Sequence, residues 1–319
     1  MLRKRNPLWR VLALIAAMTL VAVACGDDDD VATDDDADAA APEEPDPTLC
    51  GGTEFTTRED GMLGLQDEYG FEFPNVTEID DALVYNEVVQ GNCLFGSIFA
   101  TDGRINELDL VVLEDDQGFF PPFQAAVVVR EDAYDPAMDD LFNPIAATLD
   151  DDTMVELNER VSVDEEDPAD VAQDWLEQEG FLPGDGTPLE GVSITVGSKE
   201  FDEQYILGHM TRLVLEDAGA DVSDEIGLIG SDIVRQALEG GDIDIMWEYL
   251  GTAWVTYLGN EEAVSADPQE QVEALRDEDE GFVWLEPTGF NNTYGIAMTR
   301  EQSENLGLSS LSDVADYTG

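Results

Sequence analysis

The stretch VSITVGSKEFDEQYILGHMTRLVLEDAGA, residues 192–220, decides the fold class. It opens with Val192–Val196, a run rich in β-branched residues that is typical of a buried strand. From Asp202 to Ala218 the apolar residues recur at helical spacing, at Ile206, Leu207, Met210, Leu213 and Val214. The stretch therefore predicts a strand that is followed directly by an amphipathic helix.

The alternation of strand and helix continues downstream. Ile226–Ile229 and Ile243–Met246 predict two further short strands. The segment between them opens at Ser231, a residue type favoured at a helix N-cap, and closes at Gly240, which favours the end of a helix. Strands that alternate with helices predict an α/β fold with a largely parallel sheet.

Short motifs run through the chain in two groups. Residues 187–319 contain VGSKEF (196–201), EQYILG (203–208), GDIDI (241–245), EYLGTA (248–253) and FNNTY (290–294). Residues 48–182 contain EF (54–55), REDG (58–61), TDGRI (101–105), LVVLEDD (110–116), FFPPF (119–123), LN (157–158) and DP (167–168). The first group resembles the opening half of the osmoprotectant-binding proteins of ABC importers, the family that captures glycine betaine, carnitine and choline. The second group resembles the closing half of the same family.

The two halves stand in reversed order relative to that family. The resemblance therefore implies a circular permutation, which is feasible because domain termini are often close together at the surface. The joint at 183–188 has turn composition, and the chain stops at 311–319, where the family continues into the strand before Glu54. The alternative is a tandem duplication that lacks its outer halves. Permutation predicts that Thr48 lies near residue 319 and that 183–188 form an exposed turn, whereas duplication predicts two independent cores.

The resemblance implies a fold of two α/β lobes joined by two crossing strands, of the type II periplasmic-binding-protein kind. The ligand is then expected in the cleft between the lobes. Carried over to this permuted chain, lobe A is continuous and covers 128–292. Lobe B is split and covers 48–127 and 293–319.

The N-terminal residues have the pattern of an export signal. Basic residues precede a short apolar core, Val11–Ala24, which is too short for an ordinary membrane span. The core ends in small residues before Cys25, which resembles a bacterial lipobox, so we expect 1–25 to be a lipoprotein signal peptide with Cys25 lipidated. The alternative is an uncleaved anchor with an incidental cysteine. Residues 26–47 are acidic, without basic or aromatic residues, and are expected to form a disordered tether.

The charge of the chain excludes two classes of partner. The chain has 74 acidic and 13 basic residues and a formal net charge of −61. Nucleic-acid binding rests on Lys and Arg that neutralise phosphate, and an anionic membrane surface repels an acidic protein. We interpret the charge as a heavily solvated acidic surface whose self-repulsion is screened by salt. Contact with the membrane is therefore expected through the lipid anchor only.

Two cysteines remain once Cys25 is assigned to the lipobox. Outside the cytoplasm an even pair favours a disulfide, so we expect Cys50 and Cys93 to be bonded. Their Cα atoms should then lie about 4.4–6.8 Å apart. The alternative is two buried free thiols.

The family builds an aromatic cage for the quaternary ammonium group, and the resemblance carries four cage positions over to this chain. Tyr249 and Tyr294 match two cage tyrosines, whereas Phe99 and Phe123 stand where tyrosine is usual. Aromatic faces suit a cation whose charge is spread over methyl groups, each contributing roughly 0.5–2 kcal/mol once desolvated. Phenylalanine lacks the hydroxyl, so the cage is expected to be weaker or to select a bulkier ligand. The alternative for each ring is core packing.

The resemblance also implies a site for the carboxylate of a betaine. Arg58, Lys199 and Thr252 stand in family motifs at positions that can bind it, and arginine can do so bidentately. The alternative for the two cations is ion pairing with the abundant acids. This set favours a carboxylated zwitterion over choline. Arg104 is expected to have a structural role.

Catalysis, a bound metal and a cofactor are not expected. The sole histidine, His209, lies on the predicted helix after Lys199, where we expect an exposed or capping role. The sequence offers no evident Ser-His-Asp set and no His or Cys metal cluster. Trp247 and Trp254 flank Tyr249 and could line the cleft or fill the core; we favour the core.

The sequence thus predicts an extracytoplasmic substrate-binding lipoprotein of an ABC importer, anchored to the bacterial cell membrane, which delivers its ligand to a permease driven by an ATPase. A second interpretation is a ligand-sensing surface lipoprotein with the same fold that is not coupled to transport. A third is a surface hydrolase that acts on choline esters. A neighbouring permease gene would favour transport, and a neighbouring kinase or receptor gene would favour sensing.

Overall fold

The structure, a computed structural model, describes residues 45–184, 186–260 and 264–318. The expected signal peptide, Cys25 and most of the expected tether lie outside the described residues. Pro45–Gly319 form a single compact unit. Among the helices described, none combines the length and the apolar character that a membrane crossing requires.

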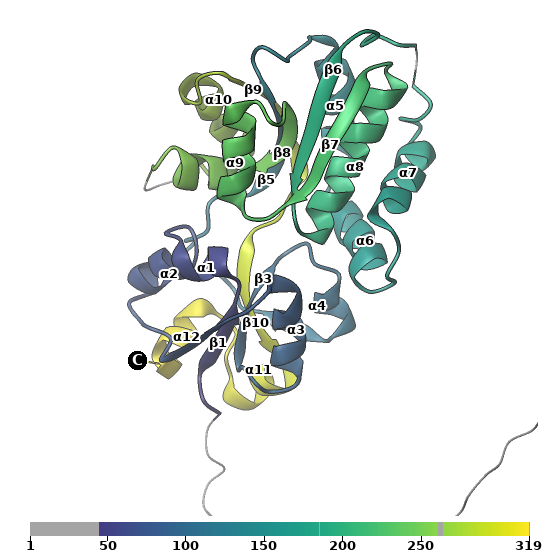
Figure 1. Ribbon diagram of the computed structural model, residues 1–319. Helices are drawn as coiled ribbons and strands as arrows, with labels where there is room; N and C mark the ends of the chain where they lie inside the picture. Colours follow the sequence, from purple (N-terminus) through teal and green to yellow (C-terminus); the bar gives the residue numbers. More distant parts are fainter. Residues whose placement is uncertain (1–44, 185, 261–263, 319) are drawn as a thin grey trace, which may run out of the picture. The chain divides into compact units, whose positions relative to one another are not determined.

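Lobe B is built on a five-stranded sheet with the strand order β2-β1-β3-β10-β4 (Figure 1). Its strands are β1 (Thr48–Gly51), β2 (Asn75–Glu78), β3 (Phe95–Phe99), β4 (Leu110–Val112) and β10 (Tyr294–Thr299). β1 is parallel to β2 and β3, whereas β10 is antiparallel to β3 and β4. Its helices are α1 (Thr53–Thr57), α2 (Met62–Tyr69), α3 (Asp81–Val89), α4 (Arg104–Glu107), α11 (Arg300–Leu306) and α12 (Leu311–Thr318).

Lobe A contains a second five-stranded sheet, with the order β7-β6-β8-β5-β9. Its strands are β5 (Gln124–Arg130), β6 (Ser193–Lys199), β7 (Asp221–Leu228), β8 (Ile245–Tyr249) and β9 (Phe282–Asn291). β6 is parallel to β7 and β8, whereas β5 is antiparallel to β8 and β9. Its helices are α5 (Ala137–Thr148), α6 (Asp151–Ser162), α7 (Pro168–Glu179), α8 (Asp202–Asp217), α9 (Ser231–Gly240), the π-helical turn η1 (Thr252–Tyr257) and α10 (Pro268–Glu278).

The two sheets share one connection pattern. Four strands of each sheet follow one another in the sequence, β1–β4 in lobe B and β6–β9 in lobe A. In both sheets the first of these four lies between the second and the third, and a fifth strand from the other half of the chain lies between the third and the fourth. That inserted strand is β10 in lobe B and β5 in lobe A, and it is antiparallel in both. Residues 48–182 and 187–319 therefore do not form two independent cores.

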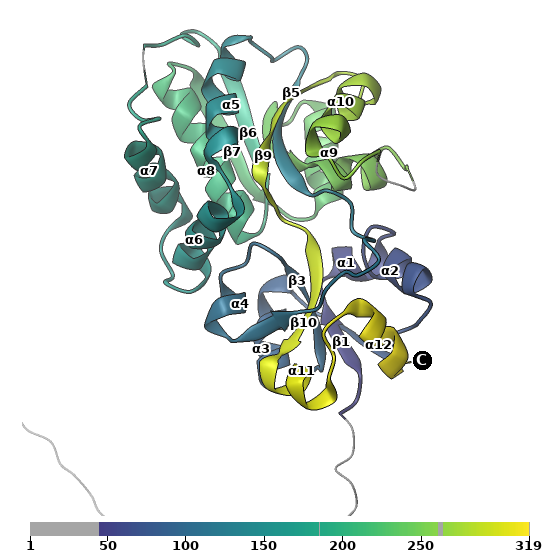
Figure 2. The same cartoon turned by 180° about the vertical axis from the view of Figure 1, so that it is seen from behind.

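Two segments cross side by side between the lobes, one entering β5 and the other joining β9 to β10 (Figure 2). The backbone N–H of Asn292 donates to the carbonyl oxygen of Phe123 at 3.3 Å, and the N–H of Phe123 donates to Oδ1 of Asn291 at 2.8 Å. Because β5 begins at Gln124, the chain enters the lobe A sheet a few residues before the 127/128 boundary that the resemblance implied.

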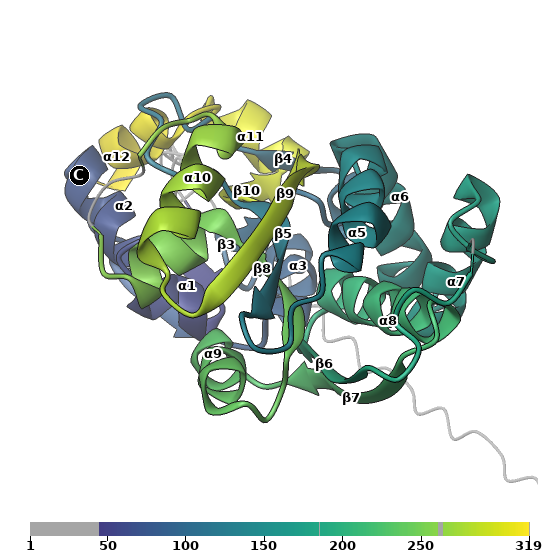
Figure 3. The same cartoon turned by 90° about the horizontal axis from the view of Figure 1, so that it is seen from above.

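Helices cover the lobe A sheet on both faces (Figure 3). Successive side chains of a strand point to opposite faces, so in β5 Val127 packs in the cluster that contains α5 and α8, and Ala126 packs in the cluster that contains α9 and α10. Trp247 and Trp254 are 1% and 6% exposed and belong to these two clusters. The prediction that both tryptophans lie in the core is confirmed.

The stretch 192–220 folds as predicted into β6 and α8, but the ends of the next helix differ from expectation. The N-cap of α9 is Gly230 and its C-cap is Gly241, both at positive φ, 87° and 76°. Ser231 does not cap the helix, because its hydroxyl donates to Glu54 of lobe B at 2.9 Å. A tertiary contact has thus replaced the local cap, and glycine takes the cap position.

Cys50 and Cys93 form a disulfide, with their Cα atoms 5.8 Å apart. Cys50 lies in β1 and Cys93 lies just before β3, so the bond joins two neighbouring strands of lobe B. The prediction of a disulfide is confirmed, and the alternative of two free thiols is wrong.

The two ends of the described unit are in contact. The Tyr317 hydroxyl donates to the carbonyl oxygen of Pro45 at 2.8 Å. Residues 183, 184 and 186–188 are exposed and lie between α7 and β6 of lobe A. Proximity of the ends and an exposed joint are two features that the permutation predicts.

Candidate ligand-binding site

A small cavity, which we call the aromatic pocket, lies between the two sheets. Its volume is about 20 Å³, and its walls are Glu54, Phe99, Phe123, Lys199, Phe201, Tyr249, Thr252, Asn292 and Tyr294. All four rings that the resemblance implied for a cage are among these walls, together with Lys199 and Thr252. Arg58 is not; it lines a larger cleft of about 630 Å³ that shares several walls with the pocket.

Strand ends from both lobes supply the rings. Phe99 is the last residue of β3 and Tyr294 is the first of β10, and the two are paired across the antiparallel ladder. Tyr249 is the last residue of β8 in lobe A, and Phe123 immediately precedes β5. Residues that are far apart in sequence therefore meet at one place because the strands that carry them end there.

Phe201 fills much of the space among these rings. Its ring stacks with Phe99, with centroids 5.3 Å apart and planes 12° apart, and with Tyr249, with centroids 6.2 Å apart. Tyr294 lies against Phe99 at 5.4 Å and edge-on to Phe123 at 5.5 Å. A cavity of about 20 Å³ has room for roughly one water molecule, so a larger ligand enters only if this stack opens.

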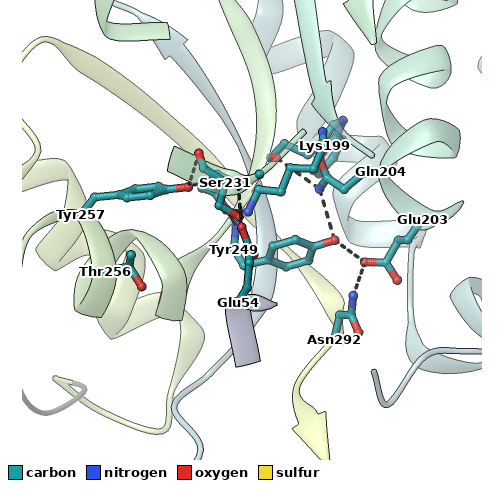
Figure 4. Close-up of polar contacts among 12 residues, drawn as sticks. Glu54, Lys199, Glu203, Gln204, Ser231, Tyr249, Thr256, Tyr257 and Asn292 are labelled. Carbon is teal, nitrogen blue, oxygen red and sulfur yellow. Dashed lines mark hydrogen bonds and ion pairs between the residues drawn. The ribbon is translucent and has the colours of Figure 1, made fainter. Parts of the chain in front are cut away.

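A buried carboxylate holds Tyr249 in place (Figure 4). Glu203 accepts hydrogen bonds from the Tyr249 hydroxyl at 2.7 Å and from Nδ2 of Asn292 at 2.9 Å. It also accepts from the hydroxyl of Thr101 in lobe B at 2.6 Å and from Nδ2 of Asn158 at 3.1 Å. Burial raises the pKa of Glu203, and these donors oppose that shift. The ring of Tyr249 is therefore fixed by a network that reaches both lobes.

Lys199 already has an anionic partner. Its Nζ lies 2.6 Å from Oε1 of Glu248, and the two side chains are 4% and 2% exposed. Glu248 also accepts from the hydroxyl of Tyr257 at 2.9 Å and from the backbone N–H of Tyr249 at 2.7 Å. The ammonium of Lys199 lies 5.0 Å from the centre of the Tyr249 ring. A ligand carboxylate that approaches Lys199 thus has to compete with Glu248.

Glu54 joins Arg58 to lobe A. Its carboxylate lies 2.8 Å from Nη2 of Arg58 and accepts from the N–H and the hydroxyl of Ser231, at 2.6 and 2.9 Å. Burial opposes the ionisation of Glu54, but the charges of Lys199 and Arg58 outweigh it, so the pKa of Glu54 is lowered. Nη1 of Arg58 is buried and has no hydrogen-bond partner within the described chain. Arg58 therefore keeps one donor for a further acceptor.

The larger cleft is strongly acidic. Three cations line it, Arg58, Arg104 and Lys199, and nine carboxylate residues line it, Glu54, Glu78, Asp80, Asp81, Asp102, Glu200, Asp202, Glu203 and Asp232. Nε and Nη2 of Arg104 donate to the two oxygens of Asp102, at 2.9 and 2.6 Å, and its guanidinium lies 4.3 Å from the centre of the Tyr85 ring. These contacts agree with the structural role expected for Arg104.

Asp81 gives the cleft a testable pH dependence. Burial first, and then the charges of Glu54, Asp80 and Glu200, raise the pKa of Asp81 from 3.8 to about 7. Because the folded protein binds this proton more tightly than the unfolded chain, the resulting stability is complete below about pH 4 and is lost as the pH rises through about 7. We expect the free energy of unfolding, measured with denaturant between about pH 5 and 8, to fall with pH, and Asp81→Asn to reduce this slope. Equal slopes in the wild type and Asp81→Asn, with exposed Asp164→Asn as the charge-matched control, would contradict the assignment.

His209 is not among the walls of the aromatic pocket or of the larger cleft. His209 is half-buried on α8, and burial and the charge of Arg212 lower its pKa. It is neither exposed nor a cap, so that expectation was wrong, because the helix packs on this side. Over the residues that the structure describes, no group of three or more His, Cys, Asp or Glu side chains is placed to hold a metal ion.

Sequence reasoning missed several residues of the site. Phe201, Glu203 and Asn292 stand inside motifs that were recognised, and Glu54 stands in another. Their motif positions were the available signal. In a chain with 74 acidic residues, the identity of a carboxylate by itself gives no reason to select it.

Comparisons with known proteins identify the relatives of this chain. A family model described as the substrate-binding domain of ABC-type glycine betaine transport systems matches residues 28–178 and 192–319. The glycine-betaine-binding protein of Pseudomonas aeruginosa is 43% identical over 123 residues, which cover 39% of each chain. The chemotactic signal transduction substrate-binding protein CosB of Halobacterium salinarum is 29% identical over 130 residues, again 39% of each.

One solved structure, a glycine betaine/carnitine/choline ABC transporter protein, is 27% identical with a TM-score of 0.34, over 44% of this chain and 53% of that one. The chain spans about two fifths of the length of these two curated relatives.

Proposed function

The chain belongs to the family of substrate-binding domains of ABC-type glycine betaine transport systems, and on that premise we propose that it captures a quaternary-ammonium osmoprotectant between its two lobes. Glycine betaine, proline betaine, carnitine and choline are the candidate ligands. One observation carries the proposal: rings from four separate segments, Phe99, Phe123, Tyr249 and Tyr294, meet at one pocket between the lobes.

The chemistry of the pocket suits such a ligand. A quaternary ammonium group donates no ordinary hydrogen bond, and its methyl surface is best matched by aromatic faces. Phe201 adds a fifth ring to the four expected ones. For a betaine, the free Nη1 of Arg58 and the hydroxyl of Thr252 are the groups we assign to the carboxylate. Lys199 contributes only if it leaves Glu248.

Capture is proposed to work by closure of the lobes about their two crossing segments. Two sets of hydrogen bonds join the lobes beside the pocket: Ser231 donates to Glu54, and Thr101 donates to Glu203. A ligand that touches rings from both lobes favours the closed arrangement, because those contacts are lost on opening. We assign the next steps, docking to a permease and release driven by an ATPase, by family membership, together with export and lipid anchoring at Cys25.

Calorimetric titration of the purified protein with the four candidate ligands tests the proposal. We expect saturable binding of at least one quaternary-ammonium compound and none of an uncharged isostere such as 3,3-dimethylbutanol. Absence of binding by all four compounds, in protein shown to be folded by its thermal transition, would sink the proposal.

Arg58 provides a test of the carboxylate assignment. We expect Arg58→Ala to weaken betaines by about tenfold or more and choline by much less, because a hydrogen bond to a charged group contributes about 1.5–3 kcal/mol and only betaines present a carboxylate. Titration of both ligand classes measures this. Arg160→Ala is the control, since Arg160 pairs with Glu166 away from the cleft. Equal losses for both classes would mean that Arg58 is structural.

A second candidate function, ligand sensing without transport, is favoured by the match to the chemotactic protein CosB. The two are distinguished by uptake of labelled ligand in cells that lack the protein. Loss of uptake supports transport, whereas normal uptake with a lost response to the ligand supports sensing.

A further inference from the structure

We propose that Glu54 makes this site selective for ligands with a net positive charge, such as choline, over zwitterions such as glycine betaine. The inference rests on the proposed function and names the ligand class of the same site. It departs from the preference for a zwitterion that the sequence indicated.

Among the described residues, Glu54 is the one carboxylate residue in the walls of the aromatic pocket, and it also pairs with Arg58. It belongs to α1, faces the pocket with Lys199 and Tyr294, and lies 2.8 Å from Nη2 of Arg58. Its lowered pKa means that it is ionised at neutral pH. A cation in the pocket therefore lies beside an ionised carboxylate that is one-third exposed, and it shares that carboxylate with Arg58.

Both cations that could attract a ligand carboxylate are neutralised by protein carboxylates. Arg58 is paired with Glu54 at 2.8 Å, and Lys199 is paired with Glu248 at 2.6 Å. The free Nη1 of Arg58 can still donate to a carboxylate at short range, but the Arg58–Glu54 pair exerts little net attraction beyond contact distance. A zwitterion thus gains a hydrogen bond from Nη1 of Arg58, but its carboxylate is repelled by the carboxylate of Glu54.

The approach to the pocket adds to this preference. Nine carboxylate residues and three cations line the larger cleft, and the acids still outnumber the cations when Asp81, whose pKa is about 7, is left out, so the field attracts cations and is nearly indifferent to a neutral zwitterion. Steering of this kind increases the association rate and weakens with salt. Glu54 lines both the cleft and the pocket, so it lies where the two join.

The other carboxylates of the site are less suited to this role. Glu248 is saturated by Lys199, Tyr257 and a backbone N–H, and Glu203 has four donors. Burial raises the pKa of Glu203. Neither lines the aromatic pocket, and Glu248 is only 2% exposed. Glu54 is also paired, with Arg58 and Ser231, but it lines the pocket and its side chain is 34% exposed.

Glu54→Gln tests the inference by removing the charge while it retains the size and an acceptor oxygen for Ser231. We expect the wild type to bind choline more tightly than glycine betaine in calorimetric titrations. In Glu54→Gln, choline should weaken by about tenfold, the effect of one nearby charge in a partly solvated site, while glycine betaine should bind at least as tightly as before. Asp232→Asn is the matched control, because Asp232 lines the outer cleft, is exposed and does not line the pocket. It should change the choline-to-betaine ratio by less than about twofold.

The outcomes separate this inference from the proposed function. If the wild type binds both ligands and Glu54→Gln changes them by the same factor, the inference is overturned and the proposed function stands. If the wild type binds neither choline nor glycine betaine, the inference is overturned, and the proposed function falls as well only if proline betaine and carnitine also fail to bind. Should Glu54→Gln fail to fold, as judged by its unliganded thermal transition, Arg58→Gln gives the opposite test: it unpairs Glu54 and should raise the ratio in favour of choline, and an unchanged ratio overturns the inference.

Discussion

Tyr249→Ala is expected to weaken the binding of every quaternary-ammonium ligand by up to about 30-fold. The change removes one aromatic face, which contributes roughly 0.5–2 kcal/mol to cation binding. It also removes a hydroxyl donor from the buried Glu203 and a stacking partner from Phe201. Glu203 keeps its donors from Thr101, Asn158 and Asn292, so the loss of affinity is set by the ring face and reaches about 2 kcal/mol. Calorimetric titration with choline and glycine betaine measures the loss.

Two variants show whether the ring itself is responsible. Tyr249→Phe keeps the ring and loses only the hydroxyl, so it should lie between the wild type and Tyr249→Ala. Tyr134→Ala removes a tyrosine that bonds to Asp139 and does not line the pocket, and it should bind normally. Wild-type affinity in folded Tyr249→Ala would show that this residue belongs to the core and not to a cage.

Loss of the disulfide is expected to lower the free energy of unfolding by about 4 kcal/mol. Cys50 and Cys93 are 43 residues apart, and in the chain-entropy model a loop of that length contributes about this amount by restricting the unfolded chain. Denaturant unfolding of the Cys50→Ser/Cys93→Ser variant measures the change. A reducing agent should destabilise the wild type to the same degree and leave the double variant unaffected. Equal midpoints for the wild type and the double variant would contradict the expectation.

Local sequence signals predicted the layers of lobe A well. The β-branched run before Lys199 and the helical spacing from Asp202 onward depend only on neighbouring residues, and they became β6 and α8. The N-cap of α9 was not predictable, because Ser231 hydrogen-bonds to Glu54, which is 177 residues distant in the sequence. Such a contact has no local signature.

The rings of the site were predictable from motifs, but their arrangement was not. Each predicted ring lines the aromatic pocket, yet Phe201, two residues after Lys199 in the same motif, was overlooked and occupies the middle of the stack. The pairing of Lys199 with Glu248 was equally hidden. With 74 acidic residues in the chain, each cation has many candidate partners, and only the folded arrangement selects one.

We propose that the reversed order of the halves reflects a circular permutation. The two sheets share one strand order, which supports this proposal. Because of it, a chain that opens between α12 and β1 has the same connections as one that opens between α7 and β6, except that the two lobes exchange their places in the sequence. The contact between Tyr317 and Pro45 supports it as well, and so does the exposure of the joint residues 183, 184 and 186–188. Two separate cores for the halves, which the duplication alternative requires, are not found within the described residues.

The strand inserted into lobe B has a consequence for synthesis on the ribosome. Within the described sheet β4 pairs with β10 alone, and β10 begins only at Tyr294, whereas lobe A has all its strands once Asn291 has been made. Lobe A is thus able to fold first although most of lobe B precedes it, the reverse of the usual order from the N-terminus. Until β10 emerges, β3 and β4 present unpaired edges to other chains. The emerging chain therefore exposes these edges for pairing with other chains during the interval between β4 and β10.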